Sequence, residues 1–297
     1  MKDQKKAYIY ALLAVTMWST VATAFKIALR YVTPLELLLY ASFVSTILLF
    51  FIILVQNKFN QLRDYSAKQW LHSLLLGALN PFFYYIVLFE AYDILLAQEA
   101  QTLNYTWGIT IAILSVPFLK QKMKLRSLIA IFISFFGVII ISTRGRLHSL
   151  EFSNPYGVAL AVGSSLVWAF FWIFNLKDDR DEVLKLFLNF SFGFVFIFIA
   201  NLFFGRLQLP NWRGILAVSY VGIFEMGITF VVWLKALQFS QTTSKVSNLI
   251  FLSPFLSLVF INVILGEKIY ISSVIGLFFI ILGIILQNYR NKIPTEL

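Results

Sequence analysis

The 297-residue chain is 60% hydrophobic and only 13% charged, with a mean hydropathy of +0.82. Soluble domains carry about 25% charged residues, so this composition excludes an ordinary soluble domain and indicates an integral membrane protein. The absence of cysteine excludes disulfides and thiolate metal sites. The net charge of +10 would suit a nucleic-acid partner unless the basic residues have another explanation.

Ten apolar runs follow one another along the chain. Each has about 20 residues, the length of a helix that crosses the hydrocarbon core of a bilayer. The predicted spans are 7–29, 34–55, 70–92, 94–118, 125–143, 156–176, 183–204, 214–234, 243–265 and 270–289. The connections between them are too short for a soluble domain, so the sequence predicts an all-α protein embedded in the lipid bilayer.

The basic residues explain the net charge as a topology signal. If the N-terminus is cytoplasmic, 17 of the 24 basic residues fall at the inner surface and six at the outer surface, with Lys26 inside the first span. Lysine and arginine accumulate in cytoplasmic loops of membrane proteins. The sequence therefore predicts that both termini are cytoplasmic, and it gives no support to a nucleic-acid partner.

An internal repeat organises the ten spans. The segment Leu119-Lys-Gln-Lys matches Leu265-Gly-Glu-Lys at an offset of 146, and Gly77-Ala-Leu-Asn matches Gly222-Ile-Phe-Glu at an offset of 145. Each half then holds five helices, 1–146 and 147–297. Because five is odd, the second copy enters the membrane from the opposite side, which makes an inverted repeat of the kind that supports alternating access.

Small residues predict how spans five and ten pack. Ala130 and Gly137 in span five, and Gly276 and Gly283 in span ten, are each seven residues apart. Small residues on one helix face allow a close approach between membrane helices, although they are also common elsewhere in such helices. We expect spans five and ten to be neighbours.

Glu225 lies near the middle of the eighth apolar span. A charge at the centre of a bilayer costs about 2.5–3.5 kcal/mol, so a carboxylate there indicates a functional site. Desolvation disfavours its ionised form. Three roles are open to it: exchange of a proton during transport, a fixed counter-charge for a substrate ammonium group, and a structural hydrogen bond.

Other polar residues fall on one face of their helices. Thr16, Ser19, Thr20, Thr23 and Lys26 form such a stripe in span one, and Gln101, Asn104 and Tyr105 do so in span four. Polar groups facing lipid lose hydrogen bonds, so these stripes line a cavity or join helices. Spans two and seven should be more peripheral. The predicted substrate-binding residues are Thr16, Trp18, Asn80, Tyr84, Gln101, Asn104, Tyr105, Trp107, Trp168, Trp172, Glu225, Lys245 and Asn248.

Several segments carry a family resemblance. The Trp18-Ser-Thr segment with Lys26, and above all Ser253-Pro-Phe followed by Leu265-Gly-Glu-Lys, resemble the drug/metabolite transporter superfamily of EamA type over essentially the whole chain. The resemblance implies a secondary transporter in the cytoplasmic (inner) membrane of a bacterium, with a small-molecule substrate, no cofactor and no metal site.

One segment points to a branch of that superfamily. Asn104-Tyr105-Thr106-Trp107 is similar to the Asn-Tyr-x-Trp segment of the aromatic amino-acid exporters, in which the tyrosine and tryptophan line the central cavity. Gly108 stands where that branch commonly has proline. The resemblance implies export of an amino acid or a related small polar metabolite.

Other classes of protein fit less well. His72 and His148 lie on opposite sides of the membrane, and the chain has no HExxH or G-x-S-x-G segment, so an enzyme is not expected. A drug or organic-cation efflux carrier, a channel and a lipid-handling protein remain alternatives to an amino-acid exporter. Glu90 and Glu99, near the outer ends of spans three and four, are expected on a solvated rim or in an external vestibule.

Overall fold

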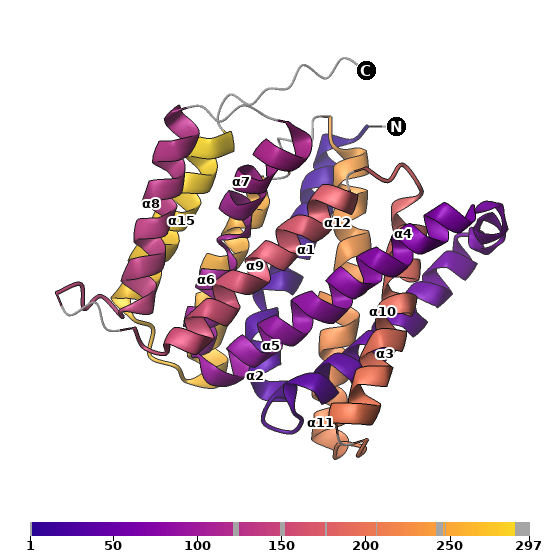
Figure 1. Cartoon of the computed structure of the whole chain (residues 1–297), viewed down its shortest axis with the longest axis horizontal. Helices are drawn as coiled ribbons and strands as arrows, with labels where there is room; N and C mark the ends of the chain where they lie inside the picture. Colours follow the sequence, from indigo (N-terminus) through magenta and orange to yellow (C-terminus); the bar gives the residue numbers. More distant parts are fainter. Residues whose placement is uncertain are drawn as a thin grey trace.

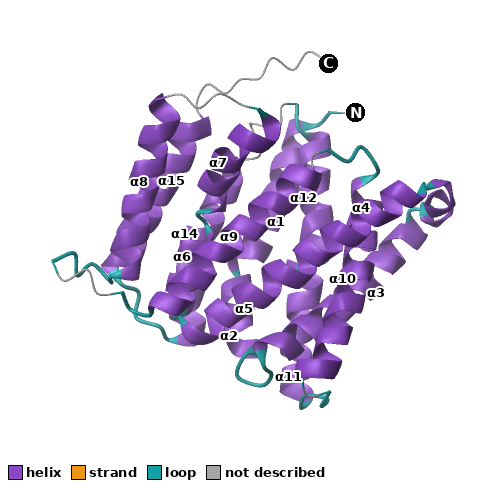
Figure 2. Cartoon of the chain, in the orientation of Figure 1, coloured by secondary structure: helices purple, strands orange, loops and turns teal. Residues whose placement is uncertain are grey.

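The computed structural model describes residues 2–120, 125–148, 152–175, 177–205, 207–241, 246 and 248–288. Throughout these ranges the regular elements are helices, and no strand occurs among them (Figure 2). In the same ranges six helices are long and apolar enough to cross a membrane, and shorter apolar helices accompany them. The predicted fold class, an all-α membrane protein, is confirmed.

The first five predicted spans correspond to helices that are continuous in two cases and interrupted in three. They are α1 (Gln4–Ser19) with α2 (Val21–Ala28), α3 (Pro34–Val55), α4 (Ala67–Gly77) with η2 (Ala78–Phe83) and α5 (Tyr84–Ile94), α6 (Ala97–Asn104) with α7 (Trp107–Leu119), and α8 (Leu125–Ser142). A short 3-10 helix, η1 (Phe59–Asp64), joins α3 to α4. Span three begins at a capping box of Ser66 and Gln69, which satisfies the free N–H groups of the first turn of α4.

The other five spans follow the same order. They are α9 (Pro155–Asn175), α10 (Glu182–Phe204), α11 (Trp212–Tyr220) with η3 (Val221–Glu225) and α12 (Ile228–Phe239), η4 (Asn248–Leu252) with α14 (Ser253–Phe260) and η5 (Ile261–Leu265), and α15 (Ile271–Asn288). In Figure 1 span three runs away from the side of the chain termini, from α4 to α5, whereas span eight runs toward that side, from α11 to α12.

Equivalent positions of the two halves share unusual backbone conformations. Asn80 lies in the π-helical segment η2 and has non-helical backbone angles. The equivalent position 145 residues later is Glu225, at which the π-helical segment η3 ends. The fourth span of each half stops at a left-handed residue, Lys120 with φ 53° and Gly266 with φ 69°, which are 146 residues apart. These offsets are the ones at which the sequence of one half matches that of the other.

Spans five and ten are packed closely together, and the expectation that they are neighbours is confirmed. In Figure 1 α8 and α15 lie side by side at one edge of the bundle. A Cβ atom added to Gly137 would lie 2.5 Å from the carbonyl oxygen of Gly276, and one added to Gly283 would lie 2.6 Å from that of Ala130. Small residues therefore let the two backbones touch.

Candidate functional site

A cavity of about 430 Å³ lies between spans one, three, four, six, eight and nine. These are the six spans that carry the predicted substrate-binding residues, and among the described residues spans two and seven contribute nothing to its wall. The residues that line it are Trp18, Val21, Ala22, Phe25, Tyr84, Leu88, Tyr92, Gln101, Asn104, Tyr105, Trp107, Ile111, Trp168, Trp172, Glu225, Phe230, Trp233, Leu237, Ile250, Phe251 and Ser253. The wall is mainly aromatic and aliphatic, with a few polar groups.

The structure brings nine of the thirteen predicted site residues to this cavity. They are Trp18, Tyr84, Gln101, Asn104, Tyr105, Trp107, Trp168, Trp172 and Glu225. They come from five different spans, so the helix packing gathers side chains that are up to about 200 positions apart in sequence.

The other four predicted residues have different positions. Thr16 is exposed and its hydroxyl donates to the carbonyl of Leu12 at 2.9 Å, so its prediction as a cavity residue is wrong. A backbone acceptor one turn away satisfies such a hydroxyl without a cavity. Asn80 is 1% exposed and is absent from the cavity wall. Lys245 lies outside the described residues, as does the side chain of Asn248.

The polar stripe of span one mainly joins helices. Ser19 donates to the Ser253 hydroxyl at 3.4 Å, and the hydroxyls of Thr20 and Tyr220 are 2.7 Å apart. Lys26 donates to two carbonyl oxygens at the end of span three, at 2.7 and 3.0 Å. Of the two interpretations that the sequence leaves open for this stripe, these contacts favour interhelical bonding.

Glu225 lies at an interruption of span eight that its surroundings stabilise. The hydroxyl of Thr229 donates to the carbonyl of Phe224, and the hydroxyl of Ser45 donates to that of Met226 at 2.8 Å. Backbone groups that leave the helical pattern within a membrane need such partners. The carboxylate faces the cavity and accepts a hydrogen bond from the Tyr85 hydroxyl at 3.0 Å.

Aromatic rings surround the space in front of this carboxylate. The Trp168 ring lies 4.5 Å from Tyr84, 5.8 Å from Trp172 and 6.3 Å from Phe230, measured between centroids. Trp18 contacts Trp233 at 5.7 Å. Such rings offer flat apolar surfaces and attract cations to their faces.

Phe230 and Trp233 also line the central cavity and are not among the predicted site residues. Trp233 follows Glu225 and Thr229 at intervals of four residues, the spacing of one helix face, and this signal could have found it. Phe230 has no comparable signal, because it is one of 32 phenylalanines in a chain of membrane helices.

The cavity amides already have protein partners. The carbonyl oxygen of Gln101 accepts from Ser257 at 2.6 Å, and Nδ2 of Asn104 donates to Ser164 at 2.9 Å. The hydroxyl of Tyr84 donates to Oδ1 of Asn104 at 3.4 Å. These groups therefore connect spans three, four, six and nine around the cavity.

At the end of the bundle opposite the termini, the loop between spans nine and ten packs onto span four. Gly266 takes a left-handed conformation that favours glycine, and the Glu267 carboxylate then accepts the N–H of Ala97 at 3.1 Å. The fully buried Gln98 donates to the carbonyl of Lys268 at 2.9 Å and accepts from the N–H of Tyr270 at 2.8 Å. The Leu265-Gly-Glu-Lys segment therefore fastens the loop between spans nine and ten to span four at this end of the bundle.

Glu99 adds an ion pair at the same end. Its side chain is 1% exposed, and its carboxylate accepts from Nε of Arg144 at 2.6 Å and from Nη2 at 3.2 Å. This hydrogen bonding raises the pKa of Arg144. The expectation that Glu99 lies on a solvated rim or in an external vestibule is wrong, because the turn after span five brings Arg144 against it.

A second cavity, of about 590 Å³, lies on the side of the termini between α9, α10 and α12. Trp172, Phe230, Trp233 and Leu237 line both cavities, so the two spaces share one wall. We call the first the central cavity and the second the inner cavity. Span seven is thus peripheral to the central cavity but not to the inner one.

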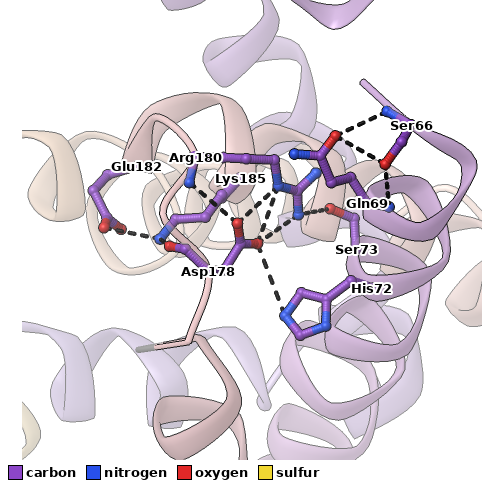
Figure 3. Close-up of polar contacts among 8 residues, drawn as sticks. All are labelled: Ser66, Gln69, His72, Ser73, Asp178, Arg180, Glu182 and Lys185. Atoms are coloured by element: carbon purple, nitrogen blue, oxygen red, sulfur yellow. Dashed lines mark hydrogen bonds and ion pairs between the residues drawn. The ribbon is translucent and has the colours of Figure 1, made fainter. Parts of the chain in front are cut away.

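The loop between α9 and α10 forms part of the wall of the inner cavity, and Figure 3 shows the polar contacts of this loop. Arg180 donates to the Asp178 carboxylate at 2.6 Å and to the hydroxyl of Ser73 at 2.8 Å. Lys185 donates to the Asp178 carbonyl at 2.6 Å and to Glu182 at 2.9 Å. Burial alone would raise the pKa of Asp178, but the hydrogen bonds and charge of Arg180 outweigh it and lower the pKa.

Within the described wall of the central cavity Glu225 is the one carboxylate, and the apolar helices around it define a multi-pass membrane protein. The EamA-like transporter family matches residues 5–143 and, a second time, residues 155–289. The chain belongs to the EamA-like transporter family, as its resemblance to the drug/metabolite transporters predicts.

Proteins similar to this chain are also transporters by name. An uncharacterized transporter of Clostridium kluyveri is 26% identical, with 99% of this chain and 96% of the relative covered. The uncharacterized transporter YvbV of Bacillus subtilis is 26% identical over 98% of this chain and 95% of its own. A solved crystal structure has the same fold, with a TM-score of 0.65, 18% identity and coverage of 96% of this chain and 97% of that one.

Proposed function

We propose that the protein exports small amine-bearing metabolites, amino acids or related compounds, by alternating access. The observation that carries this proposal is the setting of Glu225, whose carboxylate faces an aromatic cavity in which no described residue is lysine or arginine. An ammonium group supplies the opposite charge, and the rings of Trp168 and Tyr84 accept an apolar or aromatic side chain.

The closure of one end of the bundle supports alternating access. The contacts of Gln98, Glu99 and Glu267 seal the end opposite the termini, whereas the inner cavity adjoins the central one on the side of the termini. We propose that both termini are cytoplasmic in a bacterial inner membrane, which makes this conformation inward-facing. The bias of basic residues toward that side supports the assignment.

The repeat supplies the means of switching. We propose that 1–146 and 147–297 are two inverted five-helix units whose relative movement exposes the central cavity to each side in turn. The two separate family matches and the paired backbone features at offsets of 145 and 146 support this division.

A drug or organic-cation efflux carrier is the second candidate. The same feature favours it, because the described cavity wall holds a carboxylate and no basic side chain for a substrate carboxylate. A channel and a lipid-handling protein receive less support, since the contacts of Gln98, Glu99 and Glu267 join the helices at one end.

Counterflow in proteoliposomes tests the proposal. The purified protein is reconstituted, the vesicles are loaded with one unlabelled compound, and uptake of its labelled form is followed under imposed pH gradients. Amino acids of each class and simple organic cations form the panel. We expect saturable counterflow for amine-bearing compounds. Linear flux without exchange indicates a channel. Counterflow of organic cations but not of amino acids indicates the efflux carrier.

A further inference from the structure

The inner cavity contains a buried amide that lacks a protein partner. Asn189, on α10, lines this cavity and is 1% exposed. Neither its Nδ2 nor its Oδ1 has a hydrogen-bond partner among the residues that the structure describes. Buried polar groups are nearly always paired in native proteins, so an unpaired amide facing a cavity indicates that a ligand or ordered water completes it.

The charges around the inner cavity select the class of ligand. Asp178, Asp179 and Glu182 line it, and no lysine or arginine does so within the described part of the wall. Lys185 and Arg180 lie nearby, but their hydrogen bonds are directed into the loop between α9 and α10 (Figure 3). An anion would be repelled by this wall.

The three carboxylates are not equivalent. Asp178 is paired with Arg180 and Glu182 with Lys185. Asp179 is exposed, and its carboxylate has no partner in the described chain. It is therefore the group whose charge is available to a cation that enters from the side of the termini.

The wall shared by the two cavities is suited to the same chemistry. Trp172, Phe230 and Trp233 face both spaces. Ring faces attract organic cations without requiring a fixed orientation. A cation in the inner cavity is thus separated from Glu225 by rings that also stabilise it.

We propose that the inner cavity is a second binding site for an organic cation, in which Asp179 attracts the cation by its charge and Asn189 binds its ammonium group before the cation reaches the central cavity. The Asn189 carbonyl accepts a hydrogen bond from the ammonium, Asp179 supplies the opposite charge and Trp172 packs against the apolar part. The proposal rests on the proposed function in that the transported compounds carry an amine.

Protection from a thiol reagent tests this site in reconstituted full-length protein. The chain has no cysteine, so Gln238→Cys places a single reporter in the exposed part of the inner cavity wall. The reagent is N-ethylmaleimide, which crosses the membrane. The probe is benzylammonium, with neutral benzyl alcohol as its matched control, and Lys68→Cys, exposed and outside both cavities, is the control reporter.

We expect benzylammonium to slow modification at position 238 and benzyl alcohol to leave it unchanged. Asp179→Asn and Asn189→Leu should each raise the benzylammonium concentration that gives half-protection roughly fivefold. Asp179 is exposed, so its variant retains folding even if the substitution at the buried Asn189 disturbs packing. Absence of protection, protection that both substitutions leave intact, or equal protection by benzyl alcohol would overturn the proposal.

A second reporter separates this site from the proposed function. Ile111→Cys lies in the wall of the central cavity. In a Glu225→Gln background, benzylammonium should fail to protect position 111 but should still protect position 238. In the protein with Glu225 unaltered, protection at position 238 without protection at position 111 would contradict an amine site in the central cavity and would support the inner site. Protection at position 111 without protection at position 238 would contradict the inner site alone.

Discussion

The hydroxyl of Tyr85 donates a 3.0 Å hydrogen bond to Oε1 of Glu225, which joins span three to span eight. Tyr85 is fully buried, whereas Glu225 faces the central cavity, so the carboxylate is held by protein on one side and open to a substrate on the other. The contact lies where both spans leave regular helical geometry. The contact joins the two halves of the chain through two side chains, and each of them can be replaced conservatively.

Glu225→Gln should weaken binding of amine-bearing substrates. The substitution keeps size and hydrogen bonding but removes the charge, and a hydrogen bond to a charged group contributes about 1.5–3 kcal/mol, so we expect roughly a tenfold or greater rise in the half-saturating concentration. Tyr85→Phe should have a smaller effect, and the double variant should be non-additive. Counterflow measured at several pH values separates the roles: lost pH dependence with exchange retained indicates proton coupling, and unchanged affinity and pH profile leave a structural role.

The central cavity could be predicted from the sequence to the extent that its residues follow helical periodicity. Glu225 stands out because a carboxylate is costly inside an apolar span, and Gln101, Asn104 and Tyr105 stand out because they share one helix face. Thr16 follows the same spacing yet is exposed, and its hydroxyl bonds to its own helix. Periodicity identifies a polar helix face, but it does not predict whether that face contacts a cavity, another helix or lipid.

Contacts between distant segments account for what the sequence could not predict. Glu99 is buried against Arg144, which lies 45 positions away and has itself a left-handed backbone conformation at the end of span five. Asn189 shares its phenylalanine-rich helix with one other amide, Asn201, which follows 12 positions later, so no stripe marks it. Its importance appears only when α9 and α12 leave a cavity beside it.

The contact between α8 and α15 should tolerate no added side-chain atom at Gly137. In Gly137→Ala the new Cβ would lie 2.5 Å from the carbonyl oxygen of Gly276, so the helices must separate. We expect a loss of roughly 1–3 kcal/mol, measured as a lower thermal unfolding temperature in detergent. Gly163→Ala is the matched control, because no atom lies within 4 Å of the added Cβ. Equal stability of the two variants would contradict close packing at this contact.

The Glu99–Arg144 pair should hold the end opposite the termini closed. Glu99→Gln removes one charge of a buried bidentate pair, so we expect the open conformation to become roughly fivefold or more populated. The measurement is the rate at which a membrane-impermeant thiol reagent, added from that side, modifies a Leu88→Cys reporter in the central cavity.

Glu90→Gln is the matched control for the closure of that end. Glu90 lies near the same end of the bundle and is partly exposed. Its substitution should leave the labelling rate of the Leu88→Cys reporter unchanged. If the Leu88→Cys reporter were modified at the same rate in the Glu99→Gln, Glu90→Gln and unaltered backgrounds, the ion pair would have no part in closing this end.

The buried pair of Asp178 and Arg180 should make stability depend on acid pH. Burial would raise the pKa of Asp178, but the hydrogen bonds and charge of Arg180 lower it below the unfolded-state value, which is about 3.9. The folded state therefore binds fewer protons than the unfolded state in this range. The stabilisation is complete above the unfolded-state pKa and is lost as the pH falls through the lower, folded-state pKa.

Asp178→Asn should remove that dependence and destabilise the protein near neutral pH. It leaves the guanidinium of Arg180, whose side chain is 5% exposed, without its carboxylate, which costs roughly 3–5 kcal/mol for a buried pair. Thermal unfolding in detergent between neutral pH and about pH 3 measures both effects, with the exposed and unpaired Asp179→Asn as control. An Asp178→Asn variant that kept the acid sensitivity of the parent would show that other carboxylates cause it. The Arg180 pair would then be a local contact of the loop without a share in the pH dependence of folding.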